Sequence, residues 1–162
     1  MSTAEERWTP HTTVATLVYA EARFLLVEEM DQISPDKGAV LNQPAGHLEE
    51  GESLVDAAVR ETLEETGWLV EVEAYLGLYI NIAPNGVTYH RHCFIARPLS
   101  EVPDAVLDEG ILGPRWLSFD EILAEAEQDR LRSPMVLPCC RDFLAGRRYP
   151  VELIQDFRSS IK

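Results

Sequence analysis

The chain has 162 residues, close to the usual size of one domain, and we therefore expect a single core. Hydrophobic residues make up 46% and charged residues 26%, which is typical of a soluble globular protein. Acidic residues outnumber basic residues by 28 to 14, so the formal net charge is −14. This charge repels a polyphosphate backbone and argues against a nucleic-acid polymer as partner. A small anion can still bind through bridging divalent cations.

Residues 1–10 are polar, and we expect them to form a flexible N-terminal segment. They lack the basic start and apolar run of a secretory signal, and no apolar stretch approaches the roughly 20 residues that cross a bilayer. The three cysteines, Cys93, Cys139 and Cys140, fit neither a disulfide framework nor a paired zinc motif. We therefore predict reduced thiols in a cytoplasmic protein that does not bind a membrane.

Strands are expected where β-branched and apolar residues run together between turn formers. The segments are 12–20, 23–27, 40–44, 69–82, 87–99 and 115–117. Residues 83–86, Ala-Pro-Asn-Gly, are expected to turn the chain between the two longest strands. Loops are expected at 31–38 and, with several acidic residues, at 104–114.

Three helices are expected, over 53–66, 118–128 and 133–146. The first is the best defined, since Ser53 can cap its N-terminus and Gly67 can adopt the left-handed conformation that ends it. Ser133 is expected to cap the third helix, with Pro134 at its first position. Because strands and helices alternate without an internal repeat, the sequence predicts one α/β domain over residues 11–162.

Three glutamates of the first predicted helix, Glu61, Glu64 and Glu65, share one face because they are three and four residues apart. Their like charges repel one another, at the helix end where the macrodipole also disfavours negative charge. The arrangement makes sense if hard cations such as Mg²⁺ lie between the carboxylates. Taken alone, it is equally compatible with a solvated acidic face.

The residues around this helix decide between these readings, because they match a long spaced motif. Segment 46–68 resembles the Nudix box, written G-x5-E-x7-R-E-U-x-E-E-x-G-U, where U is a bulky apolar residue. The matching positions are Gly46, Glu52, Arg60, Glu61, Glu64, Glu65, Gly67 and Trp68. Thr62 departs from the pattern, which has an aliphatic residue there. The resemblance implies a Nudix-type α/β/α sandwich with a mixed sheet, in which Gly46 to Gly67 form the catalytic loop and helix.

The resemblance also implies hydrolysis of phosphoanhydride bonds with Mg²⁺ as cofactor, Mn²⁺ being an alternative. Glu61 and Glu65 are then the expected principal metal ligands, and Glu64 is a further ligand or the general base. Enzymes of this family often supply another carboxylate from a loop at about the position of residues 104–114. Glu109 is the candidate, with Asp108 as its competitor, although either residue is equally compatible with a solvated loop acid.

Other residues of the box are expected to shape the site without taking part in the chemistry. Gly46 is expected to let the backbone turn tightly, so that its carbonyl faces the metal. Glu52 and Arg60 are expected to pair and to brace the loop against the helix, and Gly67 ends the helix. Under this interpretation the box specifies the bond type and the metal but not the leaving group.

Basic residues are sparse in this acidic chain, which makes each arginine outside the box a candidate for contact with substrate phosphate. Arg91, on a predicted strand, and Arg132 and Arg147, in the C-terminal third, are the substrate-binding candidates. The simpler interpretation of each is an ordinary surface arginine or a salt bridge to one of the many acids.

The similarity extends beyond the box: segments 42–49, 131–134 and 146–157 resemble a phosphatase branch of the same family. This resemblance implies a monomer or homodimer that acts on nucleoside triphosphates and diphosphates. It also implies action on hydroxymethylpyrimidine diphosphate and thiamine diphosphate. One alternative is a narrower pyrophosphohydrolase for oxidised nucleotides or dinucleotides. Another is a nucleotide-binding module without catalysis, although such modules usually lose glutamates that this box keeps.

Overall fold

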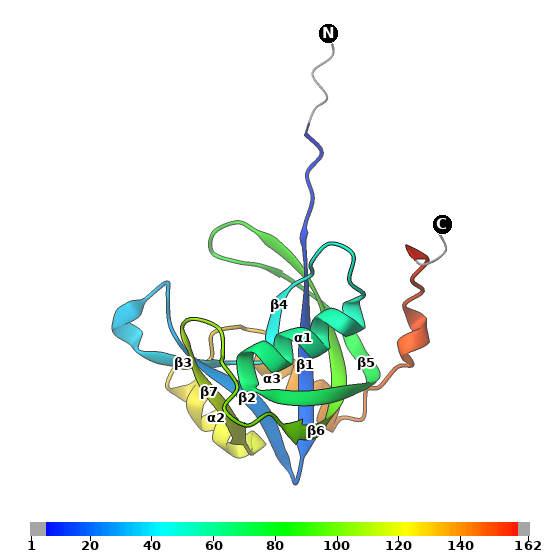
Figure 1. Cartoon of the computed structure of the whole chain (residues 1–162). Helices are drawn as coiled ribbons and strands as arrows, with labels where there is room; N and C mark the ends of the chain where they lie inside the picture. Colours follow the sequence, from blue (N-terminus) through cyan, green and yellow to red (C-terminus); the bar gives the residue numbers. More distant parts are fainter. Residues whose placement is uncertain (1–5, 159–162) are drawn as a thin grey trace.

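A computed structural model describes residues 6–158 of the chain (Figure 1). Its strands are β1 His11–Ala20, β2 Arg23–Met30, β3 Ala39–Asn42, β4 Ala45–His47, β5 Trp68–Ile82, β6 Thr88–Glu101 and β7 Ile111–Leu117. Its helices are α1 Leu54–Thr66, α2 Phe119–Glu127 and α3 Val136–Leu144, with 3-10 turns η1 Pro35–Lys37 and η2 Val151–Leu153. Residues 6–10 precede β1 without regular structure, and the rest of the expected flexible N-terminal segment lies outside the described residues.

The strands form one mixed sheet in the order β3-β2-β1-β6-β5, with β4 paired to β1 and β7 paired to β2. β1 runs parallel to β6 and antiparallel to β4. The two longest strands, β5 and β6, are antiparallel neighbours, and residues 83–86 turn the chain between them as predicted. Because β4 pairs with β1 alone in this topology, its other edge is open to side chains.

Helices cover both faces of the sheet (Figure 1). On one face, Ala57 and Ala58 of α1 pack with Val14 and Phe94 of the central strands. On the other face, α2 and α3 bury their apolar sides against the sheet in the largest core cluster. The predicted α/β/α arrangement is therefore confirmed. Within residues 6–158, no helix combines the length and the apolar character that crossing a membrane requires.

α1 begins and ends where its sequence predicts. The Ser53 hydroxyl accepts a hydrogen bond from the Asp56 N–H at 3.0 Å, and Gly67 ends the helix in the left-handed region with φ 74°. Thr62, the departure from the box, is fully buried and donates to the Ala58 carbonyl at 2.7 Å. Its hydroxyl also lies 2.8 Å from that of Thr16 on β1. A buried pair of hydroxyls therefore takes the place of the usual aliphatic contact.

Several boundaries differ from the prediction, among them the starts of the third helix and of the last strand. The third helix was expected to begin at Pro134 with Ser133 as its cap, but α3 begins at Val136. Ser133 instead accepts a hydrogen bond from the Met135 N–H at 3.2 Å and so closes a turn before the helix. β7 begins at Ile111, inside the expected acidic loop, because pairing with β2 extends the strand backwards. Both differences arise from local turns or strand pairing that a single segment does not reveal.

Candidate active site

Three carboxylates converge beside α1, those of Glu61, Glu64 and Asp108, and their ligand oxygens all lie within 4.8 Å of one another. Asp108 follows β6 in the acidic loop, and its N–H donates to the Glu64 carbonyl at 3.1 Å. This bond ties the loop to the helix and determines which loop acid joins the cluster. Of the two candidates from this loop, Asp108 belongs to the cluster, whereas Glu109 lies exposed in the turn that follows and stays a prediction.

Glu65 lies deeper than this cluster, with only 8% of its surface exposed. One of its oxygens accepts a hydrogen bond from the Ala45 N–H at 3.0 Å, at the open edge of β4. Burial raises the pKa of Glu65 to about 8, and the neighbouring Glu61 carboxylate adds to this rise. Burial also raises the pKa of Glu61, against the opposing effect of Arg60. Both glutamates therefore lie where a bound cation is more favourable than unneutralised charge.

Gly46 on β4 places the main chain against the Glu61 carboxylate. A Cβ atom at this position would lie 2.1 Å from Cδ of Glu61, which is far inside any van der Waals contact. Gly46 is a strand residue and is not among those with positive φ, so the expected tight turn is not the reason for glycine here. The position needs glycine because two groups of the site approach each other closely.

Arg60 braces the acidic residues of the box. Its guanidinium donates to both oxygens of Glu52, at 3.0 and 2.7 Å, which is the bidentate pair expected from the sequence. The same side chain donates to Glu61 at 2.9 Å and to Glu64 at 3.1 Å. It also reaches the His47 carbonyl at 3.1 Å and so connects α1 with the end of β4. A single cation thus holds three carboxylates in position.

The donor set fits a hard divalent cation. The cluster offers carboxylate oxygens only, without histidine or cysteine among its members, and oxygen is the ligand that Mg²⁺ and Mn²⁺ prefer. Three clustered carboxylates and the buried Glu65 face one guanidinium, so negative charge is in excess. The residues that would hold the cation are therefore Glu61, Glu64, Glu65 and Asp108, beside the main chain of Gly46.

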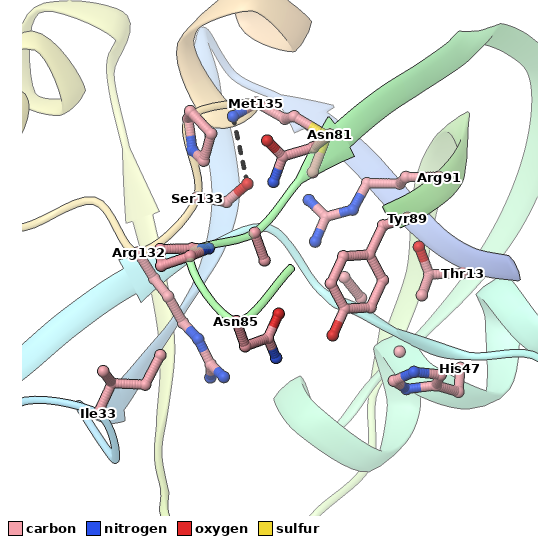
Figure 2. A pocket seen from close by; sticks show the side chains of 15 residues that line it. Thr13, Ile33, His47, Asn81, Asn85, Tyr89, Arg91, Arg132, Ser133 and Met135 are labelled. Carbon is pink, nitrogen blue, oxygen red and sulfur yellow. Dashed lines mark hydrogen bonds between the residues drawn. The ribbon is translucent and has the colours of Figure 1, made fainter. Parts of the chain in front are cut away.

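A cavity of about 530 Å³ adjoins this site at β4 (Figure 2). Ala45 and Gly46 belong to its wall, and the Glu61 carboxylate closely approaches Gly46, so the cavity and the carboxylates of α1 meet at this strand. Of the three predicted substrate-binding arginines, Arg91 and Arg132 line the cavity. Arg147 does not, because it is exposed and paired with Asp142 at 3.1 Å.

Several polar residues of the cavity were not predicted from the sequence. Asn81 of β5, Tyr89 of β6, Asn85 of the connecting turn and Thr13 of β1 all line it. The signal that could have identified them is strand register, since Asn81 pairs with Tyr89 across β5 and β6. Register follows from the assembled sheet and not from any one strand, so these residues become visible only in the structure.

Comparisons with known proteins agree with this geometry. The family model described as the NUDIX domain matches residues 9–136. The chain therefore belongs to the Nudix family, and it is a Nudix hydrolase. Among curated relatives, Phosphatase NudJ of Escherichia coli strain K12 is 41% identical over 148 residues, covering 91% of this chain and 92% of the relative. Phosphatase NudJ of Shigella flexneri has the same identity and coverage.

Solved structures show the same fold. A NUDIX hydrolase from Nitrosomonas europaea superposes with a TM-score of 0.84 at 42% identity, covering 91% of this chain and 97% of the other. A UDP-X diphosphatase superposes with a TM-score of 0.68 at 18% identity, covering 90% of this chain and 68% of the other, a likeness of fold alone. The chain thus shares the fold of these hydrolases, and both curated relatives bear the name of a phosphatase.

Proposed function

We propose that this Nudix hydrolase is a divalent-metal-dependent phosphatase that removes phosphate from small diphosphates and triphosphates. The observation that carries the proposal is the convergence of Glu61, Glu64 and Asp108 beside Gly46, a cluster suited to a hard cation. The phosphatase assignment also draws on the 41% identity to Phosphatase NudJ. We propose Mg²⁺ as the cofactor, with Mn²⁺ as a substitute.

The chemistry requires one proton transfer and one displacement at phosphorus. A divalent cation held at this cluster would neutralise charge on the phosphate oxygens and activate water for attack. Glu64 is the proposed general base because its side chain is 40% exposed, whereas that of Glu61 is 13% exposed. The water proton passes to Glu64, the water oxygen bonds to phosphorus, and the anhydride oxygen departs with the remaining phosphate chain.

The proposed substrates are nucleoside triphosphates and diphosphates, hydroxymethylpyrimidine diphosphate and thiamine diphosphate. These compounds share a terminal phosphoanhydride and differ in the organic group that enters the cavity. A cavity of about 530 Å³ lies within the roughly 300–1,000 Å³ typical of small-molecule sites. Its lining of Tyr89, Asn81 and Asn85 offers an aromatic surface and amide groups to a heterocyclic ring.

The test is a product analysis with a panel of substrates. ATP, ADP, hydroxymethylpyrimidine diphosphate, thiamine diphosphate and a dinucleotide are incubated with the enzyme and Mg²⁺, and products are separated by ion exchange. We expect orthophosphate release that stops in EDTA and returns with added Mg²⁺. Inertness toward both ATP and ADP, together with rapid cleavage of the dinucleotide, would refute the phosphatase proposal and favour the narrower pyrophosphohydrolase. An oxidised nucleotide added to the panel tests the other form of that alternative, a pyrophosphohydrolase specific for oxidised nucleotides.

Compartment and assembly form a separate part of the proposal. Cys93, Cys139 and Cys140 are buried free thiols, which suits a reducing compartment such as the cytoplasm. We propose that the enzyme acts there as a monomer or homodimer. Light scattering coupled to gel filtration, at protein concentrations that span the cellular range, distinguishes the two assemblies.

A further inference from the structure

Arg91 of β6 is a buried cation whose Nε and Nη1 atoms have no partner among residues 6–158. Only 9% of its surface is exposed. Its Nε and Nη1 atoms are covered, and neither has a hydrogen-bond acceptor among residues 6–158. No carboxylate within this range forms an ion pair with it, and burial lowers the pKa of its guanidinium. An arginine stays protonated in proteins, so the charge remains and its burial is costly unless something compensates it.

This situation contrasts with the other arginines of the site region. Arg60 binds three carboxylates, and Arg132 donates to Glu29 at 2.7 Å. Arg97, six residues further along β6, pairs with Glu71 at 2.7 Å. The chain has 28 acidic residues that could pair with an arginine. The most buried of these arginines nevertheless forms no ion pair with any described residue. A buried charge that lowers stability without improving the packing or hydrogen bonding of the fold is typical of a binding site.

The position of Arg91 places this charge in the substrate cavity. His47, Thr13 and Arg91 lie side by side on β4, β1 and β6, because Thr13 pairs with both of the others. All three line the cavity, and Figure 2 shows the guanidinium turned toward its interior between Asn81 and Tyr89. Neighbouring strands are about 4.8 Å apart, so the Arg91 backbone lies roughly 10 Å from β4, whose open edge contacts the Glu65 carboxylate.

A second polar group beside Arg91 also lacks a partner. The hydroxyl of Thr13 is buried, and no hydrogen bond to it is formed within the described range. A hydroxyl can donate to an anion that a guanidinium attracts, so the two groups are complementary to the same ligand. Arginine is particularly suited to phosphate because its planar donors match the phosphate oxygens.

We propose that Arg91 and Thr13 bind a second oxyanion of the substrate, a phosphoryl group other than the one held at the metal cluster. The proposal rests on the proposed function and extends it, because it assigns the cavity a recognition role that is independent of metal. Arg132 is less suited to this role, since Glu29 already neutralises it. Substrates would therefore be held at two points, with one phosphoryl group beside α1 and another over β1 and β6.

Removal of Arg91 should affect stability differently if this residue binds substrate than if it is purely structural. Replacing Arg91 by methionine removes an uncompensated buried charge and keeps most of the side-chain volume. Stability without ligand should therefore rise, while affinity for anions should fall. Loss of a structural arginine would change stability in the opposite direction.

Binding is tested without metal and without turnover. Wild type, Arg91→Met, Arg91→Lys and Arg97→Met are heated in EDTA with inorganic phosphate or pyrophosphate at millimolar concentrations, against chloride at matched ionic strength. We expect the anions to raise the Tm of wild type and of Arg97→Met by a few degrees. Arg91→Lys should retain part of this shift and Arg91→Met none of it. Arg91→Met in chloride should have a higher Tm than wild type.

A kinetic arm uses ADP and ATP with saturating Mg²⁺. Arg91→Met should raise KM on the order of tenfold or more, since charge-assisted hydrogen bonds are strong, and should change kcat much less. Thr13→Val should raise KM by a smaller factor. An equal anion-induced Tm shift in Arg91→Met and wild type, or an unchanged KM, overturns the subsite. Absence of hydrolysis by wild type, with the anion shift intact, instead refutes the proposed function and leaves the subsite standing.

Discussion

The acidic cluster on α1 and the arginine in the cavity both concentrate charge near β4, but only the first has partners within the described protein. Arg60 donates to Glu52, Glu61 and Glu64 and so keeps the repelling carboxylates together. Arg91 forms no such ion pair with residues 6–158, and its covered Nε and Nη1 atoms have no acceptor among them. Described protein groups therefore partly neutralise the excess charge of the acidic cluster, but none of them forms an ion pair with Arg91.

The contrast indicates what each region does in the absence of ligand. The acidic cluster is partly exposed and braced, so it can persist until a cation arrives. In the cavity, Arg91 forms no hydrogen bond through Nε or Nη1 with residues 6–158, and under the proposed subsite an anionic ligand offsets its charge. Substrate affinity should therefore be coupled to stability on the cavity side and only weakly coupled on the α1 side.

The largest expected effect is on the α1 side. Glu61→Gln and Glu65→Gln each keep the shape of the side chain but remove the charge that a cation requires. We expect each variant to lose several kcal/mol of transition-state stabilisation, on the order of a thousandfold in kcat/KM. Phosphate release with Mg²⁺ measures the loss, and Glu127→Gln on the exposed surface of α2 is the matched control. Full activity in both active-site variants would remove the basis for the metal site.

Gly46→Ala should produce the next largest effect. The new Cβ atom would displace the Glu61 carboxylate, which it would otherwise approach to 2.1 Å. The displaced group is the end of a side chain, so we expect the fold to tolerate the change while activity falls roughly a hundredfold. The Mg²⁺ concentration for half-maximal activity should rise as well. Wild-type dependence on Mg²⁺ in a folded Gly46→Ala enzyme would show that the close approach has no role in cation binding.

The same two regions show what could be predicted from the sequence. Glu61, Glu64 and Glu65 fall on one helical face through local periodicity, and the spacing of the box supplies Gly46 and Arg60. These relations need no knowledge of the rest of the fold. The long β5–β6 hairpin was predictable for the same reason, because strand and turn signals are local, whereas the α/β/α arrangement followed from the resemblance of the box to its family.

The cavity side depends on relations between segments far apart in the chain. Thr13 and Arg91 are 78 positions apart and meet through the parallel pairing of β1 and β6. Nothing in either strand reveals that pairing or shows that the guanidinium would lack a partner. The choice of Asp108 over Glu109 likewise rests on one main-chain hydrogen bond to α1. Arg147, a candidate from its charge alone, is exposed and paired with Asp142, away from the cavity.

A smaller effect concerns the support beneath the acidic cluster. Thr62→Val removes the hydroxyl that Thr16 needs as a partner inside the core. We expect a loss of about 1–2 kcal/mol in the free energy of unfolding, because a buried hydroxyl is left unsatisfied. The double variant Thr16→Val with Thr62→Val should recover most of this loss, and denaturant unfolding of all four proteins measures the coupling. Additive losses would mean that the hydroxyl pair does not support α1.

The smallest expected effect concerns His92 on β6. It tests whether burial disfavours the protonated form of this side chain even though its ring has a hydrogen-bond partner. His92 lies next to Arg91 on the strand, and its Nδ1 is 2.9 Å from the Tyr75 hydroxyl. Burial lowers the pKa of His92 below its ordinary value of 6.5, with a smaller contribution from His90. As the pH falls below 6.5, the unfolded chain therefore binds a proton that the folded protein resists, and the free energy of unfolding decreases.

The difference between wild type and His92→Gln isolates this effect from the titration of the carboxylates. Glutamine can still bond to Tyr75 but does not titrate, so the variant should lose less stability than wild type between pH 6.5 and 5. Equal slopes in wild type and His92→Gln would mean that burial does not disfavour the protonated form of His92.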